Sequence, residues 1–258
     1  MPPSTRSRPL ARCTTAWLLV LLCGAWPAQA AELVVSAASS LGNVLREIAP
    51  GFESRHPGTR LLFNIASSDT LLAQVSKGAP VDVLAVADAQ VMDRADKLGL
   101  VLPGSRRDFV GNTMVLITPR DSRIELKSLR DLASPAIRHV ALGRPDGVPA
   151  GRYARAALGE AGLWPALEAK AVYAQNVRQG LDYVARAEAQ AGFVYGSDAA
   201  SMPDKVKVAL VVPTPTPISY PIAVIAGSSR PALAQQFIEH LASPPVQAVF
   251  ARHGFVSR

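Results

Sequence analysis

The sequence predicts an α/β protein in which the chain builds two lobes. Apolar runs of strand length alternate with helical periodicity from Glu32 onward, and such strands between amphipathic helices are typical of parallel sheets that helices cover on both faces. One series of elements stops near Gly111, and a second begins directly after it. A proline-rich stretch at 213–221 then precedes a last strand and two helices. We therefore expect lobe 1 to contain residues 31–111 and 220–258, and lobe 2 to contain residues 112–219.

The elements of lobe 1 follow from the spacing of its apolar residues. After the first strand, apolar residues recur from Leu41 to Phe52 at spacings of mostly three and four residues, which is the period of one helix face. Two further strands are each followed by the same helical pattern. The expected strands are 33–35, 61–65 and 81–86, and the helices that follow them begin near Leu41, Leu71 and Ala89.

The alternation of strands and helices continues through lobe 2. Four prolines between 213 and 221 then interrupt it, and neither a helix interior nor a central strand is expected to tolerate them. These prolines mark the return to lobe 1. The expected strands are 113–118, 140–142, 171–173, 191–195 and 206–212, with helices at 150–161 and 177–189, and then a strand at 222–225 and helices at 231–241 and 244–252.

The first 30 residues are expected to be a secretory signal peptide. Three arginines precede the apolar segment 16–25, which is too short to cross a bilayer as a helix. Residues 28–30 read Ala-Gln-Ala and match a cleavage site, so we expect cleavage after Ala30. Leu22 is too bulky for the position before a lipid-modified Cys23, which disfavours a lipoprotein. The expected location is the periplasm.

Composition excludes several classes of function. Both cysteines, Cys13 and Cys23, lie within the signal segment, so the mature chain is expected to have no disulfide, cysteine nucleophile or thiolate metal ligand. The net charge of +7 falls to +4 without the three arginines of that segment, and the remaining basic residues are scattered. Because no basic run is interleaved with aromatic residues, we expect no nucleic-acid partner.

Two stretches of lobe 1 share one design, in which a strand is followed by two serines and then by an amphipathic helix. The pairs are Ser39-Ser40 and Ser67-Ser68. A helix N-terminus has unpaired backbone N–H groups and the positive end of the helix dipole, and a serine hydroxyl adds a donor without a charge. One interpretation is that each serine is only an N-cap. The duplication favours two helix ends that together hold an oxyanion.

Three junctions in lobe 2 also end a strand with neutral donors. Pro149 suits the first position of a helix, where a missing N–H has no consequence, so the N–H groups of Ala150 and Gly151 are expected to be free. The turn before Val177 repeats this arrangement, and Tyr195 ends a strand with a phenol. For the turn at Pro149 taken alone, a simple helix cap is the alternative.

The sequence gives no positive sign of catalysis. The four histidines, at 56, 139, 240 and 253, lack the spacing of a metal site, and no serine lies in a G-x-S-x-G turn. An exported hydrolase with Ser40 or Ser68 as nucleophile is a remote alternative, because it needs a histidine base within hydrogen-bond reach. We therefore expect no enzymatic activity and no cofactor.

Taken in order, these motifs resemble the periplasmic molybdate-binding proteins of bacterial ABC importers. The resemblance covers essentially the whole mature chain. Each motif alone is weakly specific, whereas the ordered set is strongly so. The motifs occupy residues 38–41, 66–68, 78–83, 111–112, 148–151, 176–178, 194–199, 220–221 and 254–255.

The resemblance implies a fold and a set of ligand contacts. The fold is that of a two-lobed type II periplasmic binding protein, in which each lobe is a mostly parallel sheet flanked by helices. Asp69 departs from the family's pattern, because it places a carboxylate beside the second serine pair. No residue is implied to be catalytic or to bind a free metal cation. The implied contacts are the hydroxyl groups of Ser40 and Ser68, the backbone N–H groups of Ala150 and Val177, and the phenol of Tyr195.

The expected function is capture of molybdate, and also of tungstate, between the lobes and delivery to an inner-membrane ABC permease with its ATPase. Neutral donors favour a fully ionised oxyanion, because a protonated one would present an unmatched O–H. Size separates molybdate from the smaller sulfate. A receptor for another tetrahedral oxyanion, such as sulfate or phosphate, is the alternative. We expect a monomer whose lobes close about the crossings near Gly111 and Tyr220.

Overall fold

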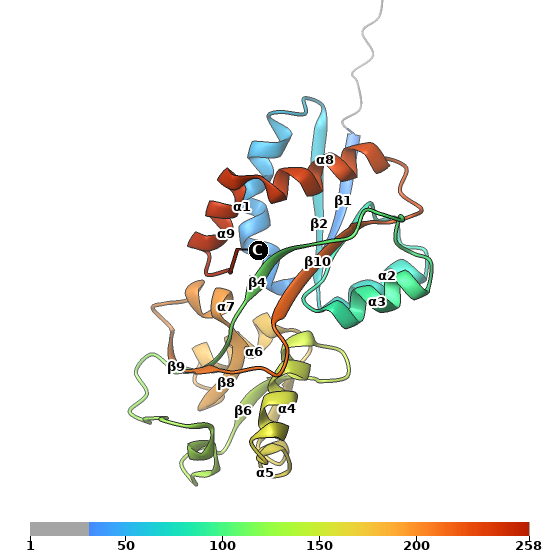
Figure 1. Ribbon diagram of the computed structural model, residues 1–258. Coiled ribbons are helices and arrows are strands. Elements are labelled where there is room, and N and C mark those ends of the chain that lie inside the picture. Colours follow the sequence, from blue (N-terminus) through green and yellow to red (C-terminus); the bar gives the residue numbers. More distant parts are fainter. Residues whose placement is uncertain (1–30, 258) are drawn as a thin grey trace, which may run out of the picture.

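The computed structural model describes residues 31–257 and contains two five-stranded sheets, one in each half of the molecule (Figure 1). The chain is an α/β protein, as the sequence predicts. The expected signal peptide, with both cysteines and the cleavage site after Ala30, lies outside the described residues. Within residues 31–257, no helix has the length and apolar character needed to cross a membrane.

The first sheet has the strand order β2-β1-β3-β10-β4. Strand β1 pairs in parallel with β2 and β3, whereas β10 runs antiparallel to both of its neighbours. Four strands therefore run in one direction, and the reversed strand comes from late in the chain. The strands are β1 (Ala31–Ala38), β2 (Thr59–Ala66), β3 (Val83–Ala85), β4 (Arg107–Asn112) and β10 (Ile218–Val224).

Helices cover this sheet on both faces, and its central strand β3 is apolar on both. In β3, Val83 and Ala85 belong to the core that includes helices α1, α8 and α9, and Leu84 belongs to the core that includes α2 and α3. The buried strand therefore reads as a continuous apolar run. The helices are α1 (Gly42–Glu53) after a 3₁₀ turn (Ser39–Leu41), α2 (Ser68–Ser76), α3 (Ala89–Lys97), α8 (Pro231–Ala242) and α9 (Pro244–Arg252).

The second sheet repeats the arrangement of the first, with the order β7-β6-β8-β5-β9. Strand β6 pairs in parallel with β7 and β8, and β5 is the reversed strand, antiparallel to β8 and β9. Both sheets therefore have one reversed strand beside their edge strand. The strands are β5 (Met114–Pro119), β6 (Val140–Gly143), β7 (Ala171–Ala174), β8 (Ala191–Tyr195) and β9 (Val206–Val212).

Helix α4 begins unusually close to the second sheet. A Cβ atom on Gly151 would lie 2.0 Å from the carbonyl oxygen of Gly143, so glycine is required for this approach. The contact fixes the first turn of α4 against the end of β6. The helical segments of this half are a 3₁₀ turn (Leu129–Ala133), α4 (Pro149–Glu160), α5 (Trp164–Glu168), α6 (Val177–Ala185) and α7 (Gly196–Ala200).

The chain passes between the two halves twice. Strand β4 continues into β5 at Thr113, and residues 213–217 join β9 to β10. Strands β4 and β10 pair with each other and run side by side from one half toward the other (Figure 1). The end of the chain joins this crossing, because the N–H of Gly111 donates to the carbonyl oxygen of Val256 at 2.6 Å.

The structure differs from the sequence prediction around these crossings. The sequence pattern does not predict β4, because only Phe109 and Val110 give this short edge strand an apolar character. Strand β10 begins at Ile218, four residues before the start of the strand expected at 222–225. The expectation that no central strand contains one of the four prolines is wrong for Pro221. This residue lies inside β10, where the pairing with β4 shifts register and a proline is tolerated.

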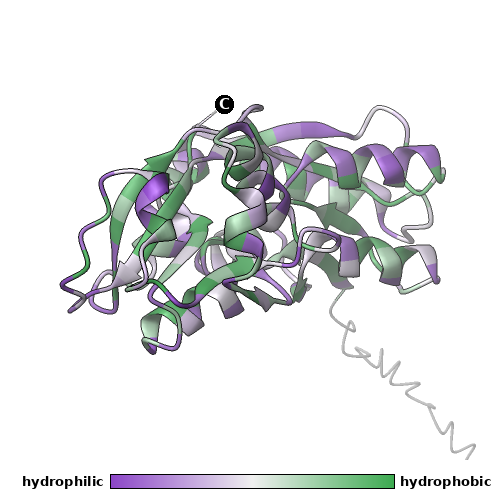
Figure 2. Cartoon of the chain, turned by 90° about the horizontal axis from the view of Figure 1, so that it is seen from below, coloured by the Kyte–Doolittle hydropathy of each residue, from purple (hydrophilic) through white to green (hydrophobic). Residues whose placement is uncertain are grey.

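Apolar side chains fill the space between the sheets and their helices. In Figure 2 the hydrophobic colour runs along the strands, and the hydrophilic colour is most frequent on the outer helices and loops. Leu33 and Val35 in the first half and Leu142 in the second half are completely buried. Burial of these strands fixes the position of their carboxyl ends, where the serine pairs and the neutral donors follow.

Acid is expected to destabilise the folded protein through His240. Burial, and then the charge of the neighbouring Arg55, lower the pKa of this imidazole from 6.5 to about 4. The unfolded chain therefore takes up a proton as the pH falls through 6.5, whereas the folded protein takes it up only near 4, so stability is lost across this interval. Thermal melts of His240→Gln, which cannot titrate, should show a smaller loss of stability over the same range. Equal losses in the two proteins would contradict this assignment.

Candidate ligand-binding site

The residues that the sequence predicts as ligand contacts line one pocket between the two halves of the molecule. The two serines come from the first half, and the other three come from the second. Each is at most 4% exposed, and the cavity that they enclose has a volume of about 10 Å³. The structure therefore brings all five predicted residues together. The other lining residues are also uncharged: Ala38, Ser39, Ser67, Ala87, Val148 and Pro149.

Parallel pairing in register explains why distant segments meet here. Strands β1 and β2 end together, because Ala38 lies opposite Ala66, and a serine pair follows each strand at the same edge. In the second half, Gly143 lies opposite Ala174 at the ends of β6 and β7. The turns before α4 and α6 therefore begin side by side. The carboxyl ends of parallel strands are where α/β folds place their ligands.

Four helices begin at this pocket: α1 with its preceding turn, α2, α4 and α6. Each helix N-terminus is equivalent to roughly half a positive charge, so four of them amount to roughly two charges. Among the described residues, no charged side chain lines the pocket. The electrostatics therefore suit a small dianion, and they achieve this without a fixed cation.

Ser67 and Ser68 have different roles, although they are adjacent. Ser67 is the N-cap of α2 and accepts a hydrogen bond from the N–H of Thr70. Ser68 is the first residue of the helix, and its hydroxyl oxygen accepts from the N–H of Ala87 at 3.0 Å. A serine oxygen that accepts here still has its own proton to donate. Ser68 is therefore an oriented donor and not the cap of its helix.

Ser40 is oriented in the same way by a chain of hydrogen bonds. The carbonyl oxygen of the Asn112 side chain accepts from the N–H groups of Thr113 and Ser197, at 2.9 and 3.4 Å. The amide nitrogen must then face Tyr220, whose hydroxyl lies 3.3 Å away and accepts from it. The hydroxyl oxygens of Tyr220 and Ser40 lie 2.9 Å apart, and either hydroxyl can donate. With Tyr220 as the donor, the proton of Ser40 is left for a ligand.

Tyr195 is the third side chain of the pocket that keeps a free donor. Its ring is buried, and its hydroxyl has no hydrogen-bond partner among the described residues. Burial, and then the neighbouring Tyr220, raise the pKa of this phenol well above its ordinary value. The group therefore stays protonated and can donate. A buried polar group without a partner is costly, and a bound anion would supply the partner.

Backbone donors complete the set. The N–H groups of Ala150 and Val177 lie in the first turns of α4 and α6, where no carbonyl of the helix can accept from them. Neither has a hydrogen-bond partner within residues 31–257. The expectation that Gly151 is also free is wrong, because its N–H donates to the carbonyl oxygen of Val148 at 3.0 Å. The tight first turn uses this donor internally.

An ion pair lies directly behind the pocket. Nε of Arg178 is 2.9 Å from Oδ1 of the fully buried Asp198. Burial raises the pKa of Asp198 to about 6, and the charge of Arg178 opposes this shift. The same guanidinium donates to the backbone carbonyl oxygen of Ser40 at 3.2 Å. Arg178 therefore connects α6 of the second half to the first serine turn while its charge is balanced.

Sequence reasoning missed the residues that orient the donors. Asn112 and Tyr220 fall in motifs of the family resemblance, but nothing in the local pattern assigns them a role. Arg178 and Asp198 follow Val177 and Tyr195 closely. A charged residue so near the end of a strand was the one local signal that could have indicated a role for them. Their partners lie far along the sequence, so only the folded structure identifies the contacts.

The histidines do not support the hydrolase alternative. None of the four lines the pocket. His56 lies 2.9 Å from the carbonyl oxygen of Phe52, and His253 lies 2.6 Å from Glu47 on the surface. Neither Ser40 nor Ser68 therefore has the imidazole base that a serine nucleophile needs.

Comparisons with known proteins agree on one family. The family model described as a bacterial extracellular solute-binding protein matches residues 33–256. The molybdate-binding protein ModA of Escherichia coli (strain K12) is 34% identical over 235 residues, which are 87% of this chain and 88% of that protein. ModA of Haemophilus influenzae is 31% identical over 260 residues, 96% of this chain and 99% of that protein.

A solved structure gives the same result. The Azotobacter vinelandii periplasmic molybdate-binding protein superposes with a TM-score of 0.77 at 25% identity, covering 88% of this chain and 99% of that one. The two-sheet fold expected from the family resemblance is thereby confirmed. These relatives are all named as molybdate-binding proteins. The chain belongs to the bacterial extracellular solute-binding proteins and is not an enzyme.

Proposed function

We propose that the protein captures molybdate, and also tungstate, and delivers it to an ABC permease with its ATPase. One observation carries this proposal: a buried pocket between the halves is lined by neutral hydrogen-bond donors and, among the described residues, by no charged side chain. The hydroxyl oxygen of Ser68 accepts from the N–H of Ala87, and the hydroxyl of Ser40 pairs with that of Tyr220, which can donate to it. Their remaining protons, with those of Tyr195 and two backbone N–H groups, suit a ligand that only accepts. The ModA relatives support the same ligand.

The donor set favours a fully ionised tetrahedral oxyanion. Such an ion has acceptors on all sides, and four helix N-termini supply roughly two positive charges to match its charge. Hydrogen phosphate would place its own O–H against these donors and leave a buried group unmatched. Sulfate has the right charge but is smaller, so its oxygens would not reach every donor at once. The pocket therefore selects by protonation and by size.

Delivery requires the ligand to enter and leave a pocket that is almost completely buried. The proposed contacts are divided between lobe 1 (31–111 and 220–258) and lobe 2 (112–219). Movement about the β4–β5 and β9–β10 crossings would expose both sets, and a ligand that touches both favours the closed form. We propose a monomer that works in the periplasm after removal of residues 1–30.

Calorimetric titration of the mature protein with four anions tests this function. Molybdate and tungstate should bind, and sulfate and phosphate should bind on the order of 100-fold more weakly or not at all. Tighter binding of sulfate or phosphate would establish the alternative receptor. Absence of binding to all four anions would reject the proposal.

A further inference from the structure

An ion-pair cluster joins the two halves beside the pocket. Arg152 lies on α4 in the second half, and its partners come from the first half. Its Nη2 atom is 2.5 Å from Oδ2 of Asp88 and 2.9 Å from Oδ2 of Asp69, and its Nε donates to Asp88 at 2.9 Å. Asp69 is in the first turn of α2, and Asp88 is the N-cap of α3. One guanidinium therefore bridges two helix N-termini of the opposite half.

In both halves, the residues of the cluster are close sequence neighbours of residues that form the proposed site. Asp69 follows Ser68, and Asp88 follows Ala87, whose N–H holds the hydroxyl oxygen of Ser68. Arg152 is two residues after Ala150 on the same helix. Two carboxylates thus stand next to a pocket that is argued to hold a dianion. Without a cation between them, they would repel the ligand across a short and poorly hydrated distance.

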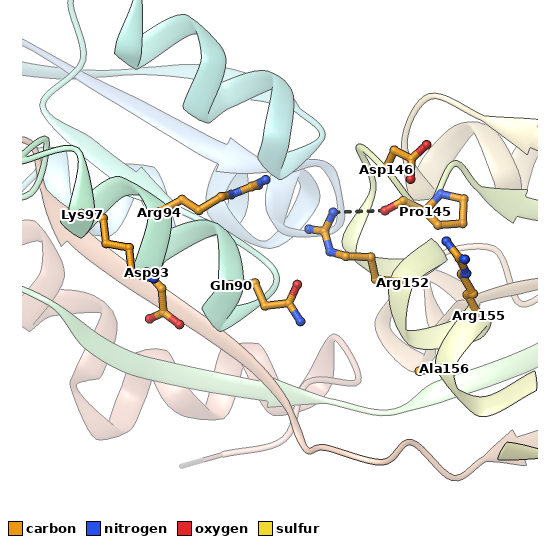
Figure 3. A pocket seen from close by; sticks show the side chains of 9 residues that line it. All are labelled: Gln90, Asp93, Arg94, Lys97, Pro145, Asp146, Arg152, Arg155 and Ala156. Carbon is orange, nitrogen blue, oxygen red and sulfur yellow. Dashed lines mark hydrogen bonds between the residues drawn. The ribbon is translucent and has the colours of Figure 1, made fainter. Parts of the chain in front are cut away.

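The burial of these groups makes the pairing stronger than a surface ion pair. The exposed fractions of the side chains are 20% for Arg152, 15% for Asp69 and 5% for Asp88. Asp69 has a second partner in Arg94 of α3, whose side chain is 50% exposed. The guanidinium groups of Arg94 and Arg152 point toward each other from α3 and α4 (Figure 3). Within residues 31–257, Arg152 is the one cation of the other half that pairs with these carboxylates.

The surroundings show where this bridge sits. Arg152 also donates to the carbonyl oxygen of Pro145 at 3.2 Å, which fixes its direction (Figure 3). It lines a charged cavity of about 760 Å³ between α3 and the start of α4, together with Asp146 and Arg155. This open, charged cavity contrasts with the neutral pocket. Arg152 lines the charged cavity, and Ala150, two residues earlier on α4, lines the neutral pocket.

We propose that Arg152 is a positioning residue that latches the two halves over the pocket and cancels the charge of Asp69 and Asp88. This inference rests on the proposed oxyanion function. The bridge exists only when the halves are together, so closure and neutralisation of the carboxylates occur in one step. The carboxylate that departs from the family's pattern, Asp69, is then compatible with an anion site because the same chain supplies its partner.

The test uses Arg152→Gln and measures the dissociation constant for molybdate by calorimetry. Removing one member of a buried, hydrogen-bonded charge pair should weaken binding on the order of 30-fold. High salt should reduce the difference from the wild type, because the repulsion that remains is electrostatic. Arg155→Gln is the matched control. This residue lines the same cavity one turn later, but its guanidinium stacks over Trp164 at 5.3 Å, so its affinity should stay near that of the wild type.

Rescue separates charge cancellation from a general structural role. Adding Asp69→Asn and Asp88→Asn to Arg152→Gln removes both unpaired charges, and asparagine keeps the N-cap of α3. The triple variant should bind molybdate at least about 10-fold more tightly than Arg152→Gln, since the buried carboxylates no longer repel the ion. Arg152→Lys, which keeps the charge, should retain intermediate affinity.

Two results would overturn the latch. One is wild-type affinity in Arg152→Gln, and the other is a loss that neither the neutral triple variant nor high salt reduces. If Arg152→Gln fails to fold, the molybdate affinities of the triple variant and of Arg152→Lys still test the latch. Neither variant leaves an unpaired buried charge in the cluster. Failure of the proposed function is a separate result, because the wild type itself would then bind no oxyanion.

Discussion

Ser68→Ala and Ser40→Ala are each expected to weaken molybdate binding by about 1.5–3 kcal/mol, the contribution of a hydrogen bond to a charged group. The oxygen of Ser68 already accepts from the N–H of Ala87, and the hydroxyl of Ser40 lies 2.9 Å from that of Tyr220. With Tyr220 as the donor to Ser40, both serines keep a proton for the anion. Calorimetric titration well below the melting temperature measures this loss without a contribution from unfolding.

Ser67→Ala is the matched control for Ser68→Ala. Ser67 lines the same pocket but uses its hydroxyl as the N-cap of α2, with Thr70 as its partner. Its removal should cost about 1 kcal/mol of folding stability and little affinity. Ser68→Ala should therefore show the larger loss of affinity in titrations, and Ser67→Ala should show the larger loss of stability in thermal melts. If Ser68→Ala and Ser40→Ala bind as the wild type and only melt earlier, these hydroxyl groups serve the fold alone.

Val177→Pro is expected to produce a loss of similar size through a backbone donor. Val177 is the first residue of α6, a position where proline is favoured because its N–H has no helical partner. The preceding Asn176 has extended backbone angles (φ −157°, ψ 168°), which a residue before proline prefers. The substitution should therefore preserve the helix and delete one N–H that faces the pocket. The expected loss of affinity is about 1.5–3 kcal/mol.

Val177→Ala controls for the side chain, because it keeps the N–H. It should bind molybdate as the wild type does, with a small loss of stability from the buried methyl groups it removes. Circular dichroism confirms that α6 is intact in both variants. Equal affinities of the proline and alanine variants would show that this N–H does not contact the ligand.

The alternation of strands and helices could be predicted from the sequence because burial imposes local periods. Apolar residues from Leu41 to Phe52 repeat at the helical period, and the first three strands are apolar on both faces, so each element is visible within its own segment. Edge strand β4 could not be predicted in this way, because only its residues Phe109 and Val110 are apolar. The expectation that prolines exclude a central strand failed at Pro221, because a register shift accommodates the ring inside β10.

The candidate site, like the fold, could be predicted from the sequence only in part. Two serine pairs and two helix starts are local features, so the sequence by itself determined which segments carry neutral donors. It could not decide which of these serines cap a helix, because all four fit the same local pattern. In the structure Ser67 caps α2, and neither Ser39 nor Ser40 is an N-cap. The roles of Ser68 and Ser40 depend on Ala87 and Tyr220, which lie 19 and 180 residues away from them.

Long-range contacts also decided the electrostatics of the site. Asp69 beside Ser68 reads in the sequence as an unfavourable carboxylate, and its effect depends on a cation that only folding brings near. Arg152, from the other half, lies within 2.9 Å of it. Local propensity acts over a few residues, whereas the sign of the charge at a site depends on every group within a few ångströms in space. The sequence determined the donors, and the tertiary structure decided their orientation and their charge balance.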